Sequence, residues 1–195
     1  MSTAAEGDQG TGFTWPEPPP GGWTADDLDR IPGLPAHTEM IDGGLFFVSP
    51  RTHFHMATLW LLEYGLRTQV PEEFYVVREM TTRLGERDRP EPDLMVVPRR
   101  ARKGPEQTSY EPADVRLAIE VVSQESVERD RTAKPQKYAR AGIEHFWRVE
   151  RNGEEPVVYV YELEPASGTY VITGIHHHQL KVAVPFPIEM ELILD

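Results

Sequence analysis

The sequence predicts an α/β fold of the α+β kind, in which a mixed β-sheet is flanked by helices. The run at 117–122 is continuously apolar apart from one glutamate, which is typical of a strand buried on both faces. Residues 52–69 instead carry leucines at helical spacing, and from 145 onwards only strand and turn patterns follow. A chain of 195 residues is long enough for one domain with a substantial core.

The composition excludes several classes of site. The chain has no cysteine, which rules out disulfides, zinc–thiolate sites and a cysteine nucleophile. It has no apolar run of about 18 residues, so we expect no transmembrane helix and no membrane association. Its first residues lack the basic and apolar regions of a secretory signal. We therefore expect a cytoplasmic protein.

The net charge of −12 disfavours tight, non-specific binding to a nucleic-acid duplex, because such binding relies on a basic surface. Two local basic clusters remain, within 99–103 and 129–140. Solvated loop and helix surface is the alternative for both clusters, and it is the interpretation we favour for the cluster within 99–103. Any contact with nucleic acid is therefore expected to be weak or local.

The first part of the chain predicts a tail followed by a short helix. Residues 1–22 are rich in Gly, Pro, Ser and Thr and are expected to form a disordered tail, which leaves 23–195 as a single domain. A short helix is expected at 23–30, with Thr24 as its N-cap.

A hairpin and a long helix come next. Strands are expected at 38–41 and 45–49, joined by Asp42-Gly43-Gly44, a turn that needs positive φ angles. The leucine spacing over 52–69 predicts a long amphipathic helix.

The remainder alternates strands with one helix. Strands are expected at 74–77, 82–84, 92–98, 117–122, 145–149, 157–163, 169–175 and 180–184, with a polar loop over 99–114 and a closing segment at 185–187. A helix is expected at 129–142, with Gly142 as its stop. Because Pro135 is tolerated only in a first turn, the helix proper is expected to begin near Ala133.

Two carboxylates stand in the most apolar strands. Asp93 heads one strand and Glu120 lies within another. Ionised carboxylates in apolar surroundings are costly unless they are paired or bind a metal, and Mg²⁺ prefers one or two carboxylates. The backbone carbonyl of Val121 is a further candidate ligand. The structural alternatives are that Asp93 caps a turn and that Glu120 pairs with an arginine such as Arg148.

Several separated motifs resemble one family. They are Glu39-Met40-Ile41-Asp42-Gly43, Ser49-Pro50, His55, Pro92-Asp93, Ile119-Glu120-Val121-Val122-Ser123, and a segment that runs from Arg129-Asp130-Arg131 through Lys134 and Tyr138 to Phe146-Trp147. In this order they resemble the Uma-two family of endonucleases, in the PD-(D/E)XK restriction-endonuclease-like superfamily. The resemblance covers roughly 39 to 186 and implies a restriction-endonuclease-like sheet.

The resemblance also implies a metal pair, Asp93 and Glu120, that holds Mg²⁺ or Mn²⁺. The superfamily lysine two residues after the glutamate is replaced here by Val122. In the Uma-two family a lysine from the following helix takes that role, and Lys134 matches its position. Lys137 is the competing candidate, and a surface lysine is the structural alternative.

Four other positions are open to two interpretations. Glu39 matches an acidic position that serves a second metal or its water, or it is an exposed strand residue. His55 matches the family histidine that contacts phosphate or acts as a general acid, or it is structural. Asp130 is expected to cap the helix, and Tyr138 to pack. The run His176-His177-His178 alternates sides in a strand, so its three rings do not converge on one ion.

The expected function is metal-dependent hydrolysis of phosphodiester bonds, in DNA, by Asp93, Glu120, Lys134, Glu39 and His55. The alternative is a catalytically inactive binding module with a nuclease fold, which the net charge favours. A third interpretation is a nuclease for RNA or a small nucleotide. The resemblance further suggests a homodimer.

Overall fold

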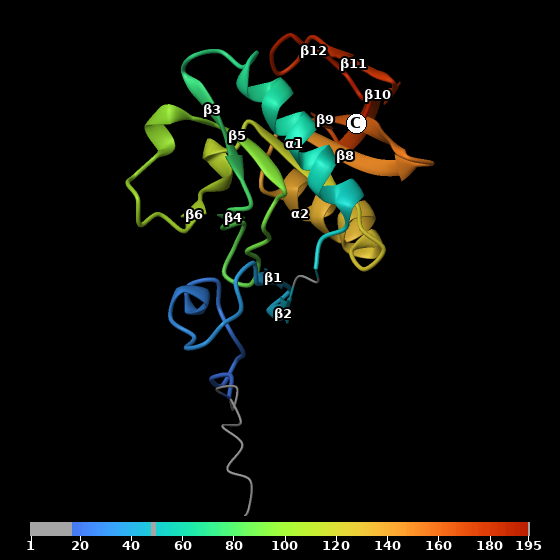
Figure 1. Ribbon diagram of the computed structural model, residues 1–195. Coiled ribbons are helices and arrows are strands. Elements are labelled where there is room, and N and C mark those ends of the chain that lie inside the picture. The colour runs from blue at the N-terminus through green and yellow to red at the C-terminus, as the bar shows by residue number, and fades with distance from the viewer. Residues whose placement is uncertain (1–16, 48–49, 195) are drawn as a thin grey trace, which may run out of the picture.

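The centre of the computed structural model, which describes residues 17–47 and 50–194, is a six-stranded mixed sheet (Figure 1). Its strand order is β10-β9-β8-β7-β5-β3. The central strand β7 (Leu117–Val121) runs parallel to β8 (His145–Asn152) and antiparallel to β5 (Leu94–Pro98). The expected mixed sheet is therefore confirmed.

The outer strands complete this sheet. β3 (Phe74–Arg78) forms one edge, and β9 (Glu155–Glu164) and β10 (Thr169–His177) extend the other side as an antiparallel meander. In the part of the chain that the structure describes, three two-stranded sheets lie outside it: β1 (Glu39–Ile41) with β2 (Gly44–Phe46), β4 (Thr81–Thr82) with β6 (Ser109–Tyr110), and β11 (Gln179–Val182) with β12 (Ile188–Glu191).

Two helices, α1 (His53–Arg67) and α2 (Lys134–Arg140), cover opposite faces of the sheet. Leucines of α1 are buried in one apolar cluster together with the odd-numbered residues of β7. Tyr138 of α2 is buried in a second cluster together with Ala118 of β7. Because alternate strand residues point to opposite faces, Glu120 points to the side of Ala118 and α2.

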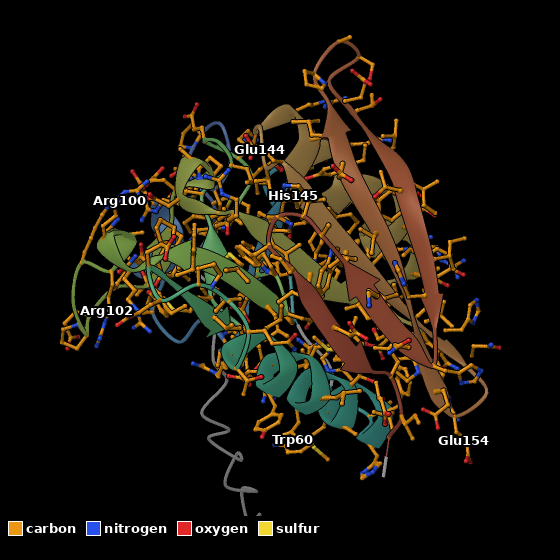
Figure 2. The ribbon with its side chains drawn as sticks, turned by 90° about the horizontal axis from the view of Figure 1, so that it is seen from above. Trp60, Arg100, Arg102, Glu144, His145 and Glu154 are labelled. Atoms are coloured by element: carbon orange, nitrogen blue, oxygen red, sulfur yellow. The ribbon has the colours of Figure 1, made fainter. Side chains whose placement is uncertain are left out.

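Helix α1 confirms the element expected at 52–69. The side chain of Thr52 accepts a hydrogen bond from the amide of His55 at 3.2 Å and so caps the first turn. The outer face of the helix carries Met56, Trp60 and Tyr64, which are exposed. Trp60 projects away from the sheet (Figure 2) and stacks on Tyr64, with 5.6 Å between the ring centroids.

The second helix agrees with the element expected at 129–142. A π-helical segment, η4 (Arg129–Ala133), runs directly into α2, which begins at Lys134, so the expected start of the helix proper near Ala133 is confirmed. Pro135 has no amide hydrogen, but it lies in the first turn of α2, where the hydrogen-bonding pattern changes from π to α. After Arg140 the chain reaches Gly142, whose φ of +80° suits a C-terminal stop.

The short helix expected at 23–30 is a single 3-10 turn, η1 (Asp27–Asp29). Thr24 does not act as an N-cap. Its amide and hydroxyl donate to the carboxylate of Asp27 at 2.8 and 2.7 Å, so the capping bonds run in the opposite direction. The hydrogen-bonded unit therefore closes a turn instead of starting an α-helix.

The expected hairpin turn is confirmed, because Asp42 and Gly43 have φ values of +51° and +78°. Two other segments differ from expectation. The loop over 99–114 contains two 3-10 turns, η2 (Arg99–Ala101) and η3 (Pro112–Asp114), besides β6. Strand β12 was not expected from the sequence.

The expected tail over 1–22 lies mostly outside the described residues, as does the end of the strand expected at 45–49. Within the described part, Gly22 donates to the carbonyl of Pro19 at 2.8 Å and closes a turn. Of the helices in the described residues, none has the length and apolar character that crossing a membrane requires.

The α1 packing generates a test of stability. Leu62 is fully buried in the cluster between α1 and the sheet. Leu62→Ala should lower the free energy of unfolding by about 2–5 kcal/mol, because it removes apolar contacts and leaves a cavity. Met56→Ala on the exposed face should change it by less than about 0.5 kcal/mol. Urea denaturation measures both, and equal losses would contradict this packing.

Candidate active site

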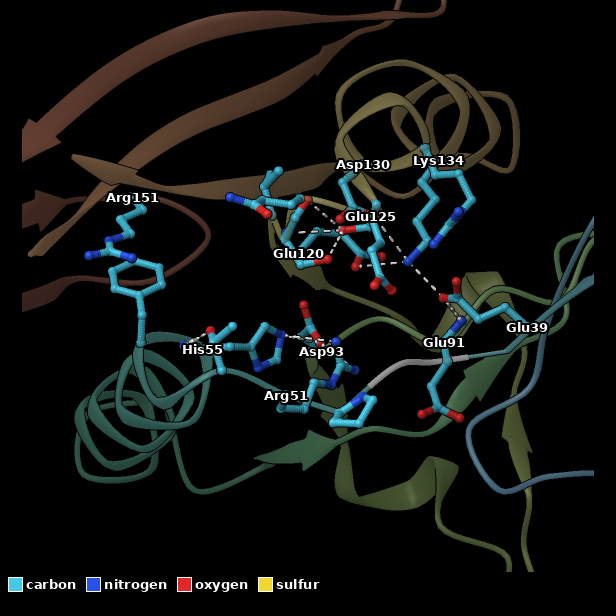
Figure 3. Close-up of a pocket in the computed structure, with 18 of the residues that line it drawn as sticks. Glu39, Arg51, His55, Glu91, Asp93, Glu120, Glu125, Asp130, Lys134 and Arg151 are labelled. Carbon is cyan, nitrogen blue, oxygen red and sulfur yellow. Dashed lines mark hydrogen bonds and ion pairs between the residues drawn. The ribbon is translucent and has the colours of Figure 1, made fainter. Parts of the chain in front are cut away.

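A pocket of about 310 Å³ lies beside the first turn of α1, the end of β7 and the first turns of the second helix (Figure 3). Five of the residues expected from the sequence line it: Glu39, His55, Asp93, Glu120 and Lys134. These five side chains are all buried. The sixth, Val121, does not line the pocket, and its expected role as a metal ligand stays a prediction.

Lys134 connects the acidic side chains of the pocket. Its ammonium lies 2.6 Å from Oε1 of Glu39, 3.0 Å from Oε2 of Glu120 and 3.2 Å from Oδ1 of Asp130. Burial alone would lower the pKa of this ammonium, but Asp130, Glu120 and Glu39 together hold the pKa well above its usual value. Lys134 is therefore a fully charged cation inside the protein.

Glu120 occupies the wall of the pocket that faces α2. Its Oε1 accepts a hydrogen bond from the hydroxyl of Tyr138 at 2.5 Å, while Oε2 faces Lys134. Burial raises the pKa of Glu120 well above its usual value, although the Lys134 charge opposes the rise. Tyr138 was expected only to pack, so its hydroxyl contact with Glu120 is an addition to the site.

Asp93 directly precedes β5. Leu94 pairs with Ile119 in the antiparallel register of β5 and β7, so the same register places Asp93 opposite Glu120. Its Oδ2 accepts from the amide of Val121 at 2.7 Å, and Oδ1 lies 3.1 Å from both His55 Nε2 and an Arg51 nitrogen. Burial would raise the pKa of Asp93, but the His55 hydrogen bond and the Arg51 and Lys134 charges outweigh it and lower the pKa. Asp93 is held as a carboxylate.

His55 contacts Asp93 from the first turn of α1. When its Nε2 carries the hydrogen, it donates to Asp93 and fixes the orientation of that carboxylate. Its Nδ1 is buried and has no hydrogen-bond partner among the described residues. The geometry makes His55 a positioning residue for Asp93.

Glu39 and two further carboxylates complete the acidic wall. Oε1 of Glu39 accepts from the amide of Glu91 at 2.9 Å, and Glu91 pairs with His37 at 2.6 Å. Burial raises the pKa of Glu91 and of Asp130. Glu39 is therefore buried, not an exposed strand residue.

Asp130 does not cap the helix. It lies inside the π-helical turn, four residues before Lys134, and contacts that lysine. This i, i+4 spacing of opposite charges was a signal present in the sequence. Glu91 and Arg51 carried no comparable sequence signal, because their contacts come from distant parts of the chain.

Other sequence candidates point elsewhere. Lys137 pairs with Asp42 at 2.6 Å and Asp88 at 2.8 Å and does not line the pocket. Arg148 pairs with Glu150 at 2.8 Å, not with Glu120.

The histidine run and the first basic cluster also lie apart from the pocket. His178 has a φ of +59° and follows the end of β10, so the strand alternation assumed for the run at 176–178 is interrupted there. Arg100 and Arg102 lie together at the outer side of the molecule, beyond the sheet (Figure 2).

The chemistry of the pocket fits a divalent cation. Among the described residues, Lys134 is the one buried Lys or Arg in the pocket wall. Five carboxylates of the wall are buried: Glu39, Glu91, Asp93, Glu120 and Asp130. Burial, followed by repulsion from the neighbouring carboxylates, raises the pKa values of Glu120 and Asp130. Oxygen donors with net negative charge suit Mg²⁺ or Mn²⁺.

The acidic side chains of the described residues are not arranged as a preformed metal site. Across 17–47 and 50–194, no group of three or more His, Asp or Glu side chains is arranged around one point. The Lys134 ammonium lies among the carboxylates instead. A bound cation would share these carboxylates with Lys134.

Comparisons with known proteins agree with this fold. A crystal structure from Anabaena variabilis, described as "a putative nuclease belonging to DUF820", superposes with a TM-score of 0.63 and 17% sequence identity, covering 83% of this chain and 89% of that one. No curated protein matches the chain. A family described as "Putative restriction endonuclease", Uma2, matches residues 25–195. On this match over most of its length, the chain belongs to the Uma2 family.

Proposed function

We propose that this protein hydrolyses phosphodiester bonds in DNA with the aid of Mg²⁺ or Mn²⁺. The observation that carries the proposal is the meeting of Glu39, His55, Asp93, Glu120 and Lys134 in one pocket, from widely separated segments. Membership of a family described as restriction endonucleases supports the reaction type. A structural role alone does not require so many buried charges in one place.

The contacts of each pocket residue indicate its role in the proposed reaction. A divalent cation held by Asp93 and Glu120 would neutralise charge on the phosphate and acidify a water. Lys134 presents a charged ammonium that stabilises negative charge developing on the phosphate oxygens. His55 orients Asp93, and Tyr138 orients Glu120, through their hydrogen bonds.

A second candidate function is a binding module without catalysis. It is favoured by the Lys134 ammonium, which already contacts three carboxylates, and by the net charge of −12. RNA or a small nucleotide, which need less basic surface than duplex DNA, are further substrates for the same chemistry. On duplex DNA we propose a homodimer, because the two strands to be cut are related by a two-fold axis.

The first prediction concerns Glu120. Wild type should nick supercoiled plasmid or cut single-stranded DNA with Mg²⁺ or Mn²⁺ but not with chelator. Glu120→Ala should reduce the rate at least about 100-fold, because it removes a metal ligand. Glu154→Ala, at an exposed residue that does not line the pocket, removes the same charge and should cleave like wild type.

Each other outcome has a clear meaning. If no condition gives cleavage while both proteins are folded, the weight moves to the binding module or to another substrate. Cleavage that survives in Glu120→Ala shows that the activity arises from a contaminant or from a different site.

A second prediction separates the two candidate lysines. Lys134→Gln should lower kcat about 100-fold or more, because it removes the charged donor beside the carboxylates. Lys137→Gln should retain kcat, since Lys137 pairs with Asp42 and Asp88 outside the pocket. Steady-state cleavage of a labelled oligonucleotide measures both. A larger loss in Lys137→Gln would refute the assignment of Lys134.

A third prediction uses the raised pKa of Glu120. The charged groups around it are Lys134, Asp130, Asp93 and Glu39. A raised carboxyl pKa contributes stability that is fully present below the unfolded value of about 4.5 and is lost as pH rises through the folded value. Asp93, whose pKa is lowered from 3.8, and Lys134, whose pKa is raised from 10.5, keep their contributions constant near neutral pH.

The metal-free wild type should therefore lose stability relative to Glu120→Gln as the pH rises above the unfolded value of about 4.5. Comparing the two proteins cancels the titration of the histidines, which they share. Adding Mg²⁺ should raise the Tm of wild type most at the higher pH, because the metal binds the carboxylate form. Thermal melts in chelator and in Mg²⁺ measure this, and a difference in Tm that is independent of pH would disprove it.

A further inference from the structure

Two arginines line the acidic pocket without pairing with its carboxylates. Arg129 and Arg151 both contribute to the pocket wall. Among the residues that the structure describes, neither has a carboxylate within ion-pair distance. By contrast, Arg51 in the same pocket contacts Asp93 at 3.1 Å.

The guanidinium of Arg129 is held by an aromatic ring. Its central carbon lies 4.9 Å from the centroid of the Phe46 ring, at the end of β2. Its Nε is buried, with no hydrogen-bond partner within the described residues. A buried guanidinium nitrogen that lacks an acceptor is costly, so this position suits an acceptor supplied by a ligand.

Arg151 is held in the same way on another side of the pocket. Its guanidinium carbon lies 5.7 Å from the centroid of the Phe54 ring, and its Nε donates to the carbonyl of Gly153 at 2.7 Å. Figure 3 shows Arg151 at one end of the pocket and Glu39 and Glu91 at the other, with His55 and Asp93 between them. Arg151 therefore lies at the end of the pocket away from Glu39 and Glu91, whereas Arg129 stacks on Phe46, the strand partner of Glu39.

The absence of ion pairs at Arg129 and Arg151 contrasts with the many Asp and Glu residues of the chain. The chain has 32 Asp and Glu against 20 Lys and Arg, so a nearby carboxylate would be readily available to any arginine. Stacking on a ring leaves the guanidinium edge, with its hydrogen-bond donors, free to meet an acceptor. Arginine in this state is suited to bidentate recognition of a phosphate.

We propose that Arg129 and Arg151 bind the backbone phosphates on either side of the one that is cut. The inference rests on the proposed function and names its substrate class: a polynucleotide strand of several phosphates, not a mononucleotide or a single diester. The two arginines position the strand across the carboxylates. They also supply local positive charge for the phosphates on a protein whose net charge is −12. They are positioning residues and do not act on the scissile bond.

The test compares two substrates. Arg129→Gln and Arg151→Gln should each raise KM for a labelled single-stranded or duplex 20-nucleotide DNA about 10-fold or more, with kcat nearly unchanged. The p-nitrophenyl ester of thymidine 5′-monophosphate has a single phosphodiester, and its kinetics should not change. Arg140→Gln removes the same charge from an exposed position outside the pocket and should match wild type with both substrates.

A binding measurement keeps this test independent of catalysis. With Ca²⁺ replacing Mg²⁺, fluorescence anisotropy gives DNA affinity against KCl concentration. Each variant should make the slope of log affinity against log salt shallower by about 0.7–0.9, the value for one lost phosphate contact. If wild type cuts nothing but binds DNA with this salt dependence, the proposed catalysis fails while the arginine assignment holds.

Three results would overturn the arginine assignment. Variants that equal Arg140→Gln in affinity and salt slope show that the two side chains contact no phosphate. Equal loss with the oligonucleotide and the single diester places the arginines at the scissile phosphate or shows damage to the fold. Absence of any DNA binding by wild type also removes the inference.

Discussion

A single buried ammonium joins the parts of the chain on which the pocket depends. Lys134, on the second helix, contacts Glu39 from the N-terminal hairpin, Glu120 from the central strand and Asp130 from its own π-helical turn. Removing a charge from such a buried set leaves the others uncompensated, which costs far more than losing a surface pair. The position of the hairpin against the sheet and the position of the helix above it are thus coupled through one side chain.

The two carboxylates on the sheet are kept in different states by their neighbours. Asp93 receives a backbone amide, His55 and Arg51, which lower its pKa, whereas burial raises that of Glu120 although Lys134 opposes it. Two acids of similar intrinsic strength are therefore unequal before any ligand arrives. A divalent cation held by Asp93 and Glu120 would bind the carboxylate form of Glu120, so its binding would release a proton from that side chain, whereas Asp93 is already ionised.

The sequence predicted the sheet better than it predicted the pocket. Continuous apolar strands, the helical spacing of α1 and the turn at Asp42 and Gly43 are local signals, and all are found in the structure. The π-helical turn that precedes α2 was not predicted, because such a turn has no simple sequence signature. The contacts of Arg51, Glu91 and Arg129 join distant segments, and no local pattern could reveal them.

The parallel pairing of β7 and β8 requires a crossover on one side of the sheet, and the second helix is that crossover. Successive side chains of an α-helix point in directions that differ by about 100° around the helix axis. An insertion or deletion of one residue between Val121 and Lys134 would therefore aim a different side chain at Glu120. The loop between η2 and η3 bears no pocket residue and is free of this constraint. Length variation within relatives of this chain should accordingly concentrate in that loop and spare the crossover.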